Sequence, residues 1–205
     1  MFAPGSGRYL ALAGAIVAVL FAIALLLSAW LVLPFAIAAF AVGLFLAIFF
    51  RDPERTPGPG IVSAADGRVA LVAQEDDHWR IAVFMNVGNV HVNRVPLAGV
   101  VRSIGDRGQG SRPAYRADAV HNRQRSYLFD TELGPVEVVQ MTGIVARRLV
   151  SFVRPEEHLA KGARFGMIVL GSRVDVLLPS ARARPTVHPG ARVRAGVSTI
   201  AEAIG

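Results

Sequence analysis

Residues 165–179 read FGMIVLGSRVDVLLP, and this stretch decides the fold class. An apolar run, Met167–Leu170, leads into Gly171-Ser172, and an alternating segment, Arg173–Pro179, follows. Alternation with a period of two is typical of a β-strand. A glycine inside such a pattern favours a bulge or a strained peptide. The stretch therefore predicts β-structure with an irregularity at Gly171-Ser172.

The same kind of pattern extends outward through residues 61–205. Short runs rich in valine and isoleucine recur between turn signals, which is typical of antiparallel sheets. The runs are Arg68–Ala73, Trp79–Met85, Val90–Val95, Val100–Ile104, Ser126–Phe129, Val136–Met141, Arg148–Val153 and Arg173–Leu178. Amphipathic helix candidates are scarce, and Pro113–His121 fits either a short helix or a loop. We expect a mostly β domain, an antiparallel β-sandwich or barrel.

A weak internal repeat lies near the C-terminus. His158–Gly162 followed by Phe165 resembles Arg192–Gly196 followed by Ile200. Each copy places a glycine turn between an apolar position and a returning strand, as in the hairpins of lipoyl-type β-sandwiches. Two ordinary β-hairpins explain the repeat equally well.

The N-terminal part is of a different kind. From Tyr9 to Phe50 there is no Asp, Glu, Lys, Arg or His. About 20 apolar residues suffice to cross a bilayer as a helix. We expect two helices, 9–32 and 35–50, with a break at Pro34, which form a transmembrane or membrane-embedded hairpin over residues 1–50. The stretch is too long for a signal peptide, and residues 51–60, RDPERTPGPG, are expected to be a linker.

Charge suggests where the chain lies. Of all residues, 53% are hydrophobic and 18% charged, with a net charge of +7. Arg8 precedes the apolar stretch, and Arg51 and Arg55 follow it, so the β domain is expected on the cytoplasmic side of the cell membrane. Its basic character favours an anionic membrane surface as a partner. Scattered arginines and few aromatics argue against nucleic acid.

Missing residue types exclude several chemistries. The chain has no cysteine, so disulfides, thiolate nucleophiles and cysteine-ligated metal sites are excluded. Lys161 is the only lysine, which leaves one candidate for a pyridoxal-phosphate aldimine. The histidines show no metal-ligand spacing, so no metal site is expected.

Ser172 is the most distinctive candidate nucleophile. A serine hydroxyl directly after a glycine in a strained peptide can turn back on the glycine carbonyl, which permits an N→O acyl shift. The resulting ester can undergo β-elimination. A plain turn or bulge is the commoner explanation of a Gly-Ser pair.

Three further candidates have ordinary alternatives. Asp66-Gly67 reads as a β-turn before a strand. His91 shares one strand face with Asn93, and that face either lines a site or meets water. Arg147-Arg148 could grip a phosphate, although an exposed pair is the commoner explanation.

Together and in this order, five segments resemble the phosphatidylserine decarboxylases in their short, membrane-anchored form. They are Phe49–Arg55, Ala65–Val69, Val90–Pro96, Thr142–Leu149 and Phe165–Val176. The resemblance covers nearly the whole chain, and its most specific part is the Gly-Ser-Arg-Val-Asp segment.

The resemblance implies a self-processing proenzyme. The chain would cut itself between Gly171 and Ser172 into a large chain, 1–171, and a small chain, 172–205, which stay associated. Ser172 would become a pyruvoyl group, the covalent cofactor. Its carbonyl would form a Schiff base with the amine of phosphatidylserine and accept the electrons released with CO2, which gives phosphatidylethanolamine.

The resemblance also implies roles for single residues. Asp66 would support the base that promotes self-cleavage, and His91 would handle the substrate carboxylate or a proton. Longer members have a second histidine where this chain has Arg94, so the base that activates Ser172 stays open between His91 and another group such as His121. Arg147 and Arg148 are candidates for contacting the lipid phosphate.

Two alternative functions stay open. The same chemistry could act on a serine phospholipid with ether-linked chains, since tail recognition is apolar and undirected. The second alternative is a non-catalytic, membrane-tethered, lipoyl-like binding module. Self-association into a homo-oligomer is not decided by the sequence.

Overall fold

The computed structural model describes residues 1–26, 29–108, 110, 122–143, 148–169 and 172–204. The chain divides into two compact units, Met1–Pro53 and Glu54–Gly205. The division falls inside the expected linker, and residues 54–60 belong to the C-terminal unit. The Gly58 N–H donates to the Gly196 carbonyl over 3.1 Å, and the Thr199 hydroxyl donates to the Pro59 carbonyl over 2.8 Å.

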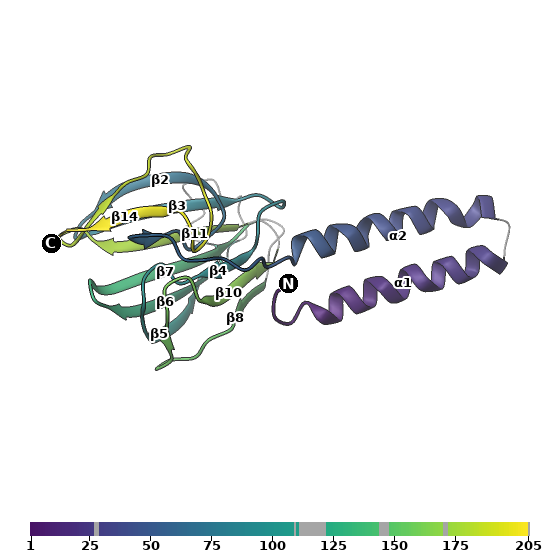
Figure 1. Cartoon of the computed structure of the whole chain (residues 1–205), viewed down its shortest axis with the longest axis horizontal. Coiled ribbons are helices and arrows are strands. Elements are labelled where there is room, and N and C mark those ends of the chain that lie inside the picture. Colours follow the sequence, from purple (N-terminus) through teal and green to yellow (C-terminus); the bar gives the residue numbers. More distant parts are fainter. Residues whose placement is uncertain (27–28, 109, 111–121, 144–147, 170–171, 205) are drawn as a thin grey trace. The chain divides into compact units, whose positions relative to one another are not determined.

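The N-terminal unit contains the two expected helices, α1 (Gly7–Leu26) and α2 (Ala29–Phe49), which lie side by side (Figure 1). The start of α1 and the end of α2 are joined where the Ala3 N–H donates to the Phe50 carbonyl over 2.8 Å. The rings of Tyr9 and Phe50 stack there, with centroids 5.4 Å apart. These contacts close the base of a helical hairpin.

The helix boundaries differ from the expected ones. The sequence predicts a break at Pro34, but α2 starts at Ala29 and continues through Pro34. A proline lacks its own amide donor, and the amides of the first helical turn have no partner inside the helix. Pro34 lies just beyond that turn, so α2 loses a single hydrogen bond, to the carbonyl of residue 30, and the apolar residues that follow remain helical.

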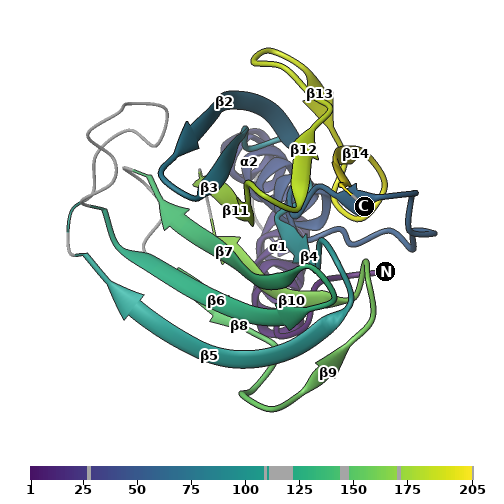
Figure 2. The same ribbon diagram turned by 90° about the vertical axis from the view of Figure 1, so that its left-hand side faces the viewer.

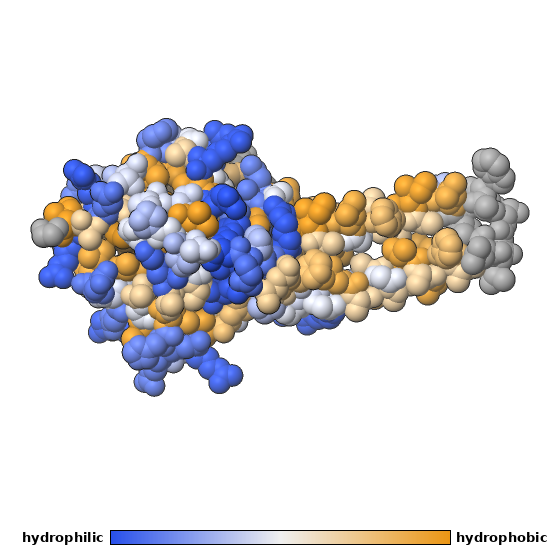
Figure 3. All heavy atoms as spheres, in the orientation of Figure 1, coloured by the Kyte–Doolittle hydropathy of each residue, from blue (hydrophilic) through white to orange (hydrophobic). Residues whose placement is uncertain are grey.

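Large apolar side chains cover the outside of the hairpin (Figure 3). Leu12 is 62% exposed, Phe35 66% and Phe40 63%. Over the residues that the structure describes, neither helix meets the length and hydropathy required of a candidate membrane span.

The C-terminal unit is built from antiparallel strands, as expected. The largest sheet has eight strands in the order β13-β2-β3-β11-β7-β6-β5-β9. These are β13 (Arg192–Val193), β2 (Gly67–Glu75), β3 (His78–Met85), β11 (Ser172–Pro179), β7 (Gly134–Thr142), β6 (Gln124–Thr131), β5 (Gly99–Arg107) and β9 (His158–Leu159).

Two three-stranded sheets complete this unit. One has the order β4-β10-β8, and the other has the order β1-β14-β12. Their strands are β4 (Val92–Arg94), β10 (Arg164–Val169), β8 (Arg148–Ser151), β1 (Ile61–Val62), β14 (Thr199–Ala203) and β12 (Ala183–Pro185). The expected segment Pro113–His121 lies outside the described residues.

The eight-stranded sheet curls into a half-barrel (Figure 2). An aromatic cluster fills part of the core: the Tyr127 and Phe165 centroids are 4.7 Å apart, and those of Phe129 and Phe165 are 5.8 Å apart. Gly166 lets β10 approach both β8 and this cluster, since a Cβ there would lie 2.7 Å from the Val150 carbonyl oxygen and 3.1 Å from the Tyr127 hydroxyl oxygen. The alternating apolar residues of β7 and β11 bury their side chains in the same core.

The two copies of the sequence repeat form equivalent turns that lie next to each other. The Gly162 N–H donates to the Val95 carbonyl, and the Gly196 N–H donates to the Ser63 carbonyl, both over 2.8 Å. Both glycines have positive φ, +81° and +74°, which side-chain-bearing residues rarely adopt. A Cβ on Gly196 would lie 3.6 Å from the Gly162 Cα, so the two turns are in close contact.

Candidate functional site

The backbone around residue 172 occupies the middle of the large sheet. Ser172 is the first residue of β11, where it pairs with Met85 of β3 and with Thr142 of β7. The preceding strand, β10, ends at Val169 in a different sheet. Val169 and Ser172 therefore belong to two different sheets, and Leu170 and Gly171 lie outside the described residues.

Several segments far apart in the sequence reach the same end of this sheet. The register sets Met85 and Thr142 beside Ser172, and it sets Arg68 of β2 opposite Phe84 of β3. Asp66 directly precedes β2, so it lies at that end as well. Two strand spacings, roughly 10 Å, separate the backbones of β2 and β11.

The carboxylate of Asp66 is held by two groups. Arg55 donates to both oxygens through a bidentate pair, with Nη2 to Oδ2 at 2.9 Å. The Ala195 N–H donates to Oδ1 over 2.7 Å. Arg55 also donates to the Ala195 carbonyl over 2.8 Å, and its side chain is only 4% exposed. The sequence alone assigned neither Arg55 nor Ala195 to the site. Arg55 belongs to the expected linker, and no sequence motif marks Ala195.

Gly67 fixes how Asp66 enters β2. Its φ is +156°, and a Cβ at this position would lie 2.1 Å from the Phe84 carbonyl oxygen. Only a glycine fits between β2 and β3 at this point. At the Asp-Gly pair, β2 therefore comes into close contact with β3, which the turn signal in the sequence does not indicate.

His91 lies just before β4 and is completely buried. Its Nδ1 is 2.9 Å from the Asn89 carbonyl oxygen. A carbonyl can only accept, so Nδ1 carries the proton, and in the neutral ring Nε2 is the basic nitrogen. The His91 carbonyl accepts from the Ile168 N–H over 3.3 Å, which places His91 beside the chain four residues before Ser172.

The strand face that His91 shares with Asn93 does not meet water, because both side chains are 0% exposed. Asn93 Oδ1 accepts from Gln140 Nε2 over 2.7 Å, and its Nδ2 lies 3.9 Å from the sulfur of Met85. Tyr127 donates to Gln140 Oε1 over 3.4 Å, and burial raises the pKa of its phenol. A buried polar network thus contacts Met85, the residue of β3 that pairs with Ser172. Gln140 was missed because its position in β7 looks like any other strand residue.

The remaining predicted residues lie in varied places. Arg148 begins β8, is exposed, and pairs with Val169 at the end of β10. Arg94 is buried and donates to the Gly162 carbonyl over 3.0 Å. It therefore supports the glycine turns described above. Arg147 and His121 lie outside the described residues.

Lys161, the single lysine, makes an exposed hydrogen bond. Its Nζ donates to the Gly60 carbonyl over 3.2 Å. In the part of the chain that the structure describes, no three His, Asp or Glu side chains form a group that could hold a metal ion.

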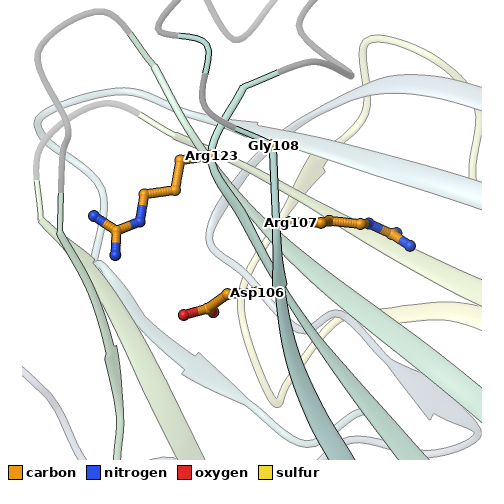
Figure 4. Close-up of a pocket in the computed structure, with 4 residues that line it drawn as sticks. All are labelled: Asp106, Arg107, Gly108 and Arg123. Carbon is orange, nitrogen blue, oxygen red and sulfur yellow. The ribbon is translucent and has the colours of Figure 1, made fainter.

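A cavity of about 470 Å³ lies at the end of β5 and the start of β6, lined by Asp106, Arg107, Gly108 and Arg123. Figure 4 shows the Asp106 and Arg123 side chains on one side of β5 and Arg107 on the other. Arg125 donates to both Asp106 oxygens, at 2.6 and 2.7 Å, and holds the pKa of that carboxyl below its usual range. The acid in this cavity is therefore already paired.

Comparison with known proteins identifies similar sequences. Residues 42–201 match the family described as phosphatidylserine decarboxylase. A phosphatidylserine decarboxylase proenzyme of Thermobifida fusca is 46% identical over 163 residues, which cover 78% of this chain and 75% of the relative. The corresponding proenzyme of Streptomyces coelicolor is 42% identical over 167 residues, 80% of this chain and 76% of the relative.

A third relative carries a different lipid in its name. A putative archaetidylserine decarboxylase proenzyme of Halobacterium salinarum is 43% identical over 172 residues, which cover 82% of this chain and 86% of the relative. The three relatives match this chain at similar identity, and all three are named as proenzymes of decarboxylases.

Proposed function

Because this chain belongs to the phosphatidylserine decarboxylase family, we propose that it decarboxylates phosphatidylserine with a pyruvoyl group made from its own Ser172. The chain is a self-processing decarboxylase, as its relatives are. The observation that carries the proposal is the position of Ser172. Ser172 begins the central strand β11, at the end of the sheet where Asp66 lies. The strand before it, β10, contacts His91 through the hydrogen bond from the Ile168 N–H to the His91 carbonyl.

Self-cleavage needs only groups of the chain itself. The Ser172 oxygen attacks the Gly171 carbonyl carbon, the bond from that carbon to the Ser172 nitrogen breaks, and an ester forms. Elimination then removes the Ser172 Cα proton, breaks the bond between Cβ and the ester oxygen, and releases the Gly171 carboxylate together with an N-terminal dehydroalanine. This enamine takes a proton at Cβ and becomes an imine, and water hydrolyses the imine to the keto group with release of ammonia.

The sheet suits a pyruvoyl group at residue 172. The backbone after the cut is paired on both sides, with β3 and with β7, so the new chain end stays in place. When present, the pyruvoyl carbonyl supplies an electrophile for the serine amine and takes up the electrons released with CO2. The residues around it hold it, orient the lipid and move protons.

His91 is the proposed proton carrier. Its Nδ1–H is fixed on the Asn89 carbonyl, which leaves Nε2 to accept or return a proton. Complete burial keeps bulk water from competing for that nitrogen. His91 is also the base proposed to activate Ser172, since Arg94 holds a turn carbonyl in place of a second histidine.

Asp66 is proposed to support this step from a fixed position. Its carboxylate is held by Arg55 and by the Ala195 N–H. We infer that the Asp66 charge acts on the site electrostatically. Its hydrogen bond also holds the backbone at Ala195, which belongs to the small chain after cleavage.

The two chains are expected to remain together. The small chain, 172–205, contributes β11 between β3 and β7, β13 beside β2, and β14 beside β1. Separation would expose the core residues Val174, Val176 and Leu178, so association persists without a covalent link.

A second candidate substrate follows from the relative of Halobacterium salinarum, whose name specifies archaetidylserine. The same headgroup chemistry on an ether-linked serine lipid needs no change in Ser172, Asp66 or His91. Turnover of ester-linked and ether-linked serine lipids by the same preparation separates the two substrates. The lipid with the larger kcat/KM is the substrate class.

We also propose that the helical hairpin inserts into the lipid bilayer of the cell membrane, with the C-terminal unit on the cytoplasmic side. The exposed apolar side chains of α1 and α2 support insertion, because water would solvate them poorly. Arg8 and Arg51 flank the hairpin and support the orientation. Arg55 does not contribute, since its charge is paired with Asp66.

The chain's lack of cysteine makes the orientation testable. A cysteine introduced in place of the exposed Arg182 should react with a membrane-impermeant maleimide in inverted vesicles and stay unlabelled in intact cells. Labelling in intact cells would place the C-terminal unit on the other side.

The experiment that tests the function compares the wild type with Ser172→Ala. The wild type should release CO2 from dispersed phosphatidylserine and appear as two chains on a denaturing gel. The variant should remain one chain and release none. An uncleaved and inactive wild type would overturn the assignment for this protein, and activity in the alanine variant would overturn the role of Ser172.

A further inference from the structure

Two arginines face each other at the edge of the large sheet. The register pairs Arg192 of β13 directly with Arg68 of β2. Like charges directly opposite each other in an antiparallel pair are destabilising. Within the described ranges, Arg68 donates to the Gly190 carbonyl over 3.1 Å, and neither arginine has a carboxylate partner. The pair is therefore unbalanced, and an anion between the two guanidinium groups would relieve the repulsion.

The same two arginines line a cavity of about 350 Å³ together with Gly67, Asn86, Gly88 and Asn89. In this loop the Asn86 N–H donates to Asn89 Oδ1 over 2.8 Å, and the Asn89 N–H donates to the Asn86 carbonyl over 2.9 Å. Since the Asn89 oxygen is occupied, its carboxamide presents NH₂ donors. The lining thus offers guanidinium and amide donors, and none of its described residues carries a carboxylate.

The cavity adjoins the candidate site on two sides. Gly67 directly follows Asp66, and the Asn89 carbonyl is the group that accepts the Nδ1–H of His91. Arg68 belongs to the large chain and Arg192 to the small chain, so the cavity is complete only while the two chains are associated.

We propose that Arg68 and Arg192 together bind the phosphate of a serine phospholipid, and this proposal rests on the decarboxylase function above. Guanidinium groups match phosphate through paired N–H donors, and two of them balance its charge better than one. In phosphatidylserine the phosphate is esterified to the serine hydroxyl, and only two carbons separate that ester oxygen from the amine, so a phosphate bound in this cavity keeps the amine and carboxylate close to the loop that holds His91. The phosphate of another anionic membrane lipid has the same chemistry, and the experiment below separates the two sources.

The test uses Arg68→Gln, Arg192→Gln and the double variant of the full chain. Arg182→Gln is the control: it is an exposed arginine of the small chain just beyond Pro179, at the opposite end of β11 from Ser172. The fraction of self-cleaved protein on a gel reports folding. KM and kcat are measured with a short-chain phosphatidylserine below its micelle concentration, and binding is measured by flotation with phosphatidylglycerol vesicles.

Loss of a charge-assisted phosphate contact should raise KM roughly tenfold in each single variant and more in the double variant, with kcat and self-cleavage close to wild type. The control should keep the wild-type KM. Unchanged KM with reduced vesicle binding would overturn the substrate assignment and give the site to a membrane lipid. Unchanged KM and unchanged vesicle binding would overturn the phosphate site altogether. An uncleaved wild type would instead contradict the proposed function, and vesicle binding would still test the arginine pair.

Discussion

Arg55 and Asp66 form a bidentate, nearly buried ion pair that joins the first residues of the C-terminal unit to the start of β2. The same guanidinium and the same carboxylate also hold the carbonyl and the N–H of Ala195. Three segments, from residues 55, 66 and 195, therefore meet at one pair of charges. After self-cleavage this contact connects the large chain to the small chain.

Removal of Arg55 should be costly because it leaves a buried carboxylate without its cation. Arg55→Met is expected to lower the free energy of unfolding by about 3–5 kcal/mol. The double variant Arg55→Met/Asp66→Leu should recover part of this loss, since both charges are then gone. Denaturant titration followed by circular dichroism measures the difference. Equal stability of Arg55→Met and wild type would show that the pair contributes nothing.

Replacement of Gly67 should disturb the site more than replacement of a comparable glycine. Gly67→Ala places a methyl group against the Phe84 carbonyl, so a loss of about 3 kcal/mol and poor self-cleavage are expected. Gly190→Ala is the matched control: its φ is +92°, but nothing lies within 4 Å of the added Cβ. The control should lose only about 1 kcal/mol, and thermal unfolding compares the two. Similar losses in both variants would rule out the close approach as the cause.

His91→Asn separates the two functions of the imidazole. The asparagine can still donate to the Asn89 carbonyl but has no counterpart of Nε2. If His91 carries protons, the rate of self-cleavage or of CO2 release should fall about 10²–10⁴-fold with stability little changed. Gel time courses and CO2 assays give these rates. A variant that cleaves and turns over like the wild type would exclude His91 from both steps.

The Asp106–Arg125 pair predicts a pH dependence of stability. Arg125 depresses the pKa of the folded Asp106 carboxyl. A depressed folded pKa contributes stability above the unfolded value, about 3.9, and that contribution is lost as the pH falls through the lower folded value. Because Asp106 is 46% exposed, the effect is expected to be below about 1 kcal/mol. The free energies of unfolding of wild type and Asp106→Asn should differ at pH 7, and the difference should shrink as the pH falls below the unfolded value and through the lower folded one. A difference that grows toward low pH would have the wrong sign.

Much of the fold could be predicted because it is local in the sequence. Alternation in Arg173–Pro179 and the valine-rich runs predict strands directly, and the uncharged stretch Tyr9–Phe50 predicts helices. The break expected at Pro34 is absent because the loss of one hydrogen bond near a helix start is tolerated. The repeat around Gly162 and Gly196 correctly indicates two equivalent turns, but their mutual contact depends on tertiary structure.

The site was less accessible to prediction because its contacts join distant segments. Arg55 lies in a Pro/Gly-rich stretch and looks like a solvated linker charge, yet its partner is eleven residues away and its second contact is Ala195. Burial of His91 and Asn93 depends on β10 and β7, and the strand pattern of residues 90–96 gives no sign of it. The pairing of Arg68 with Arg192 follows from a register that no local pattern specifies.

The most direct test of the account is the intact mass of the small chain from purified wild-type protein. The account predicts a fragment that begins at residue 172, resists N-terminal sequencing, and is lighter by one ammonia than the same peptide with an ordinary serine. Reduction of its carbonyl by borohydride should add two hydrogens and abolish CO2 release. A full-length chain with an intact serine at position 172 that still releases CO2 from phosphatidylserine would contradict the account.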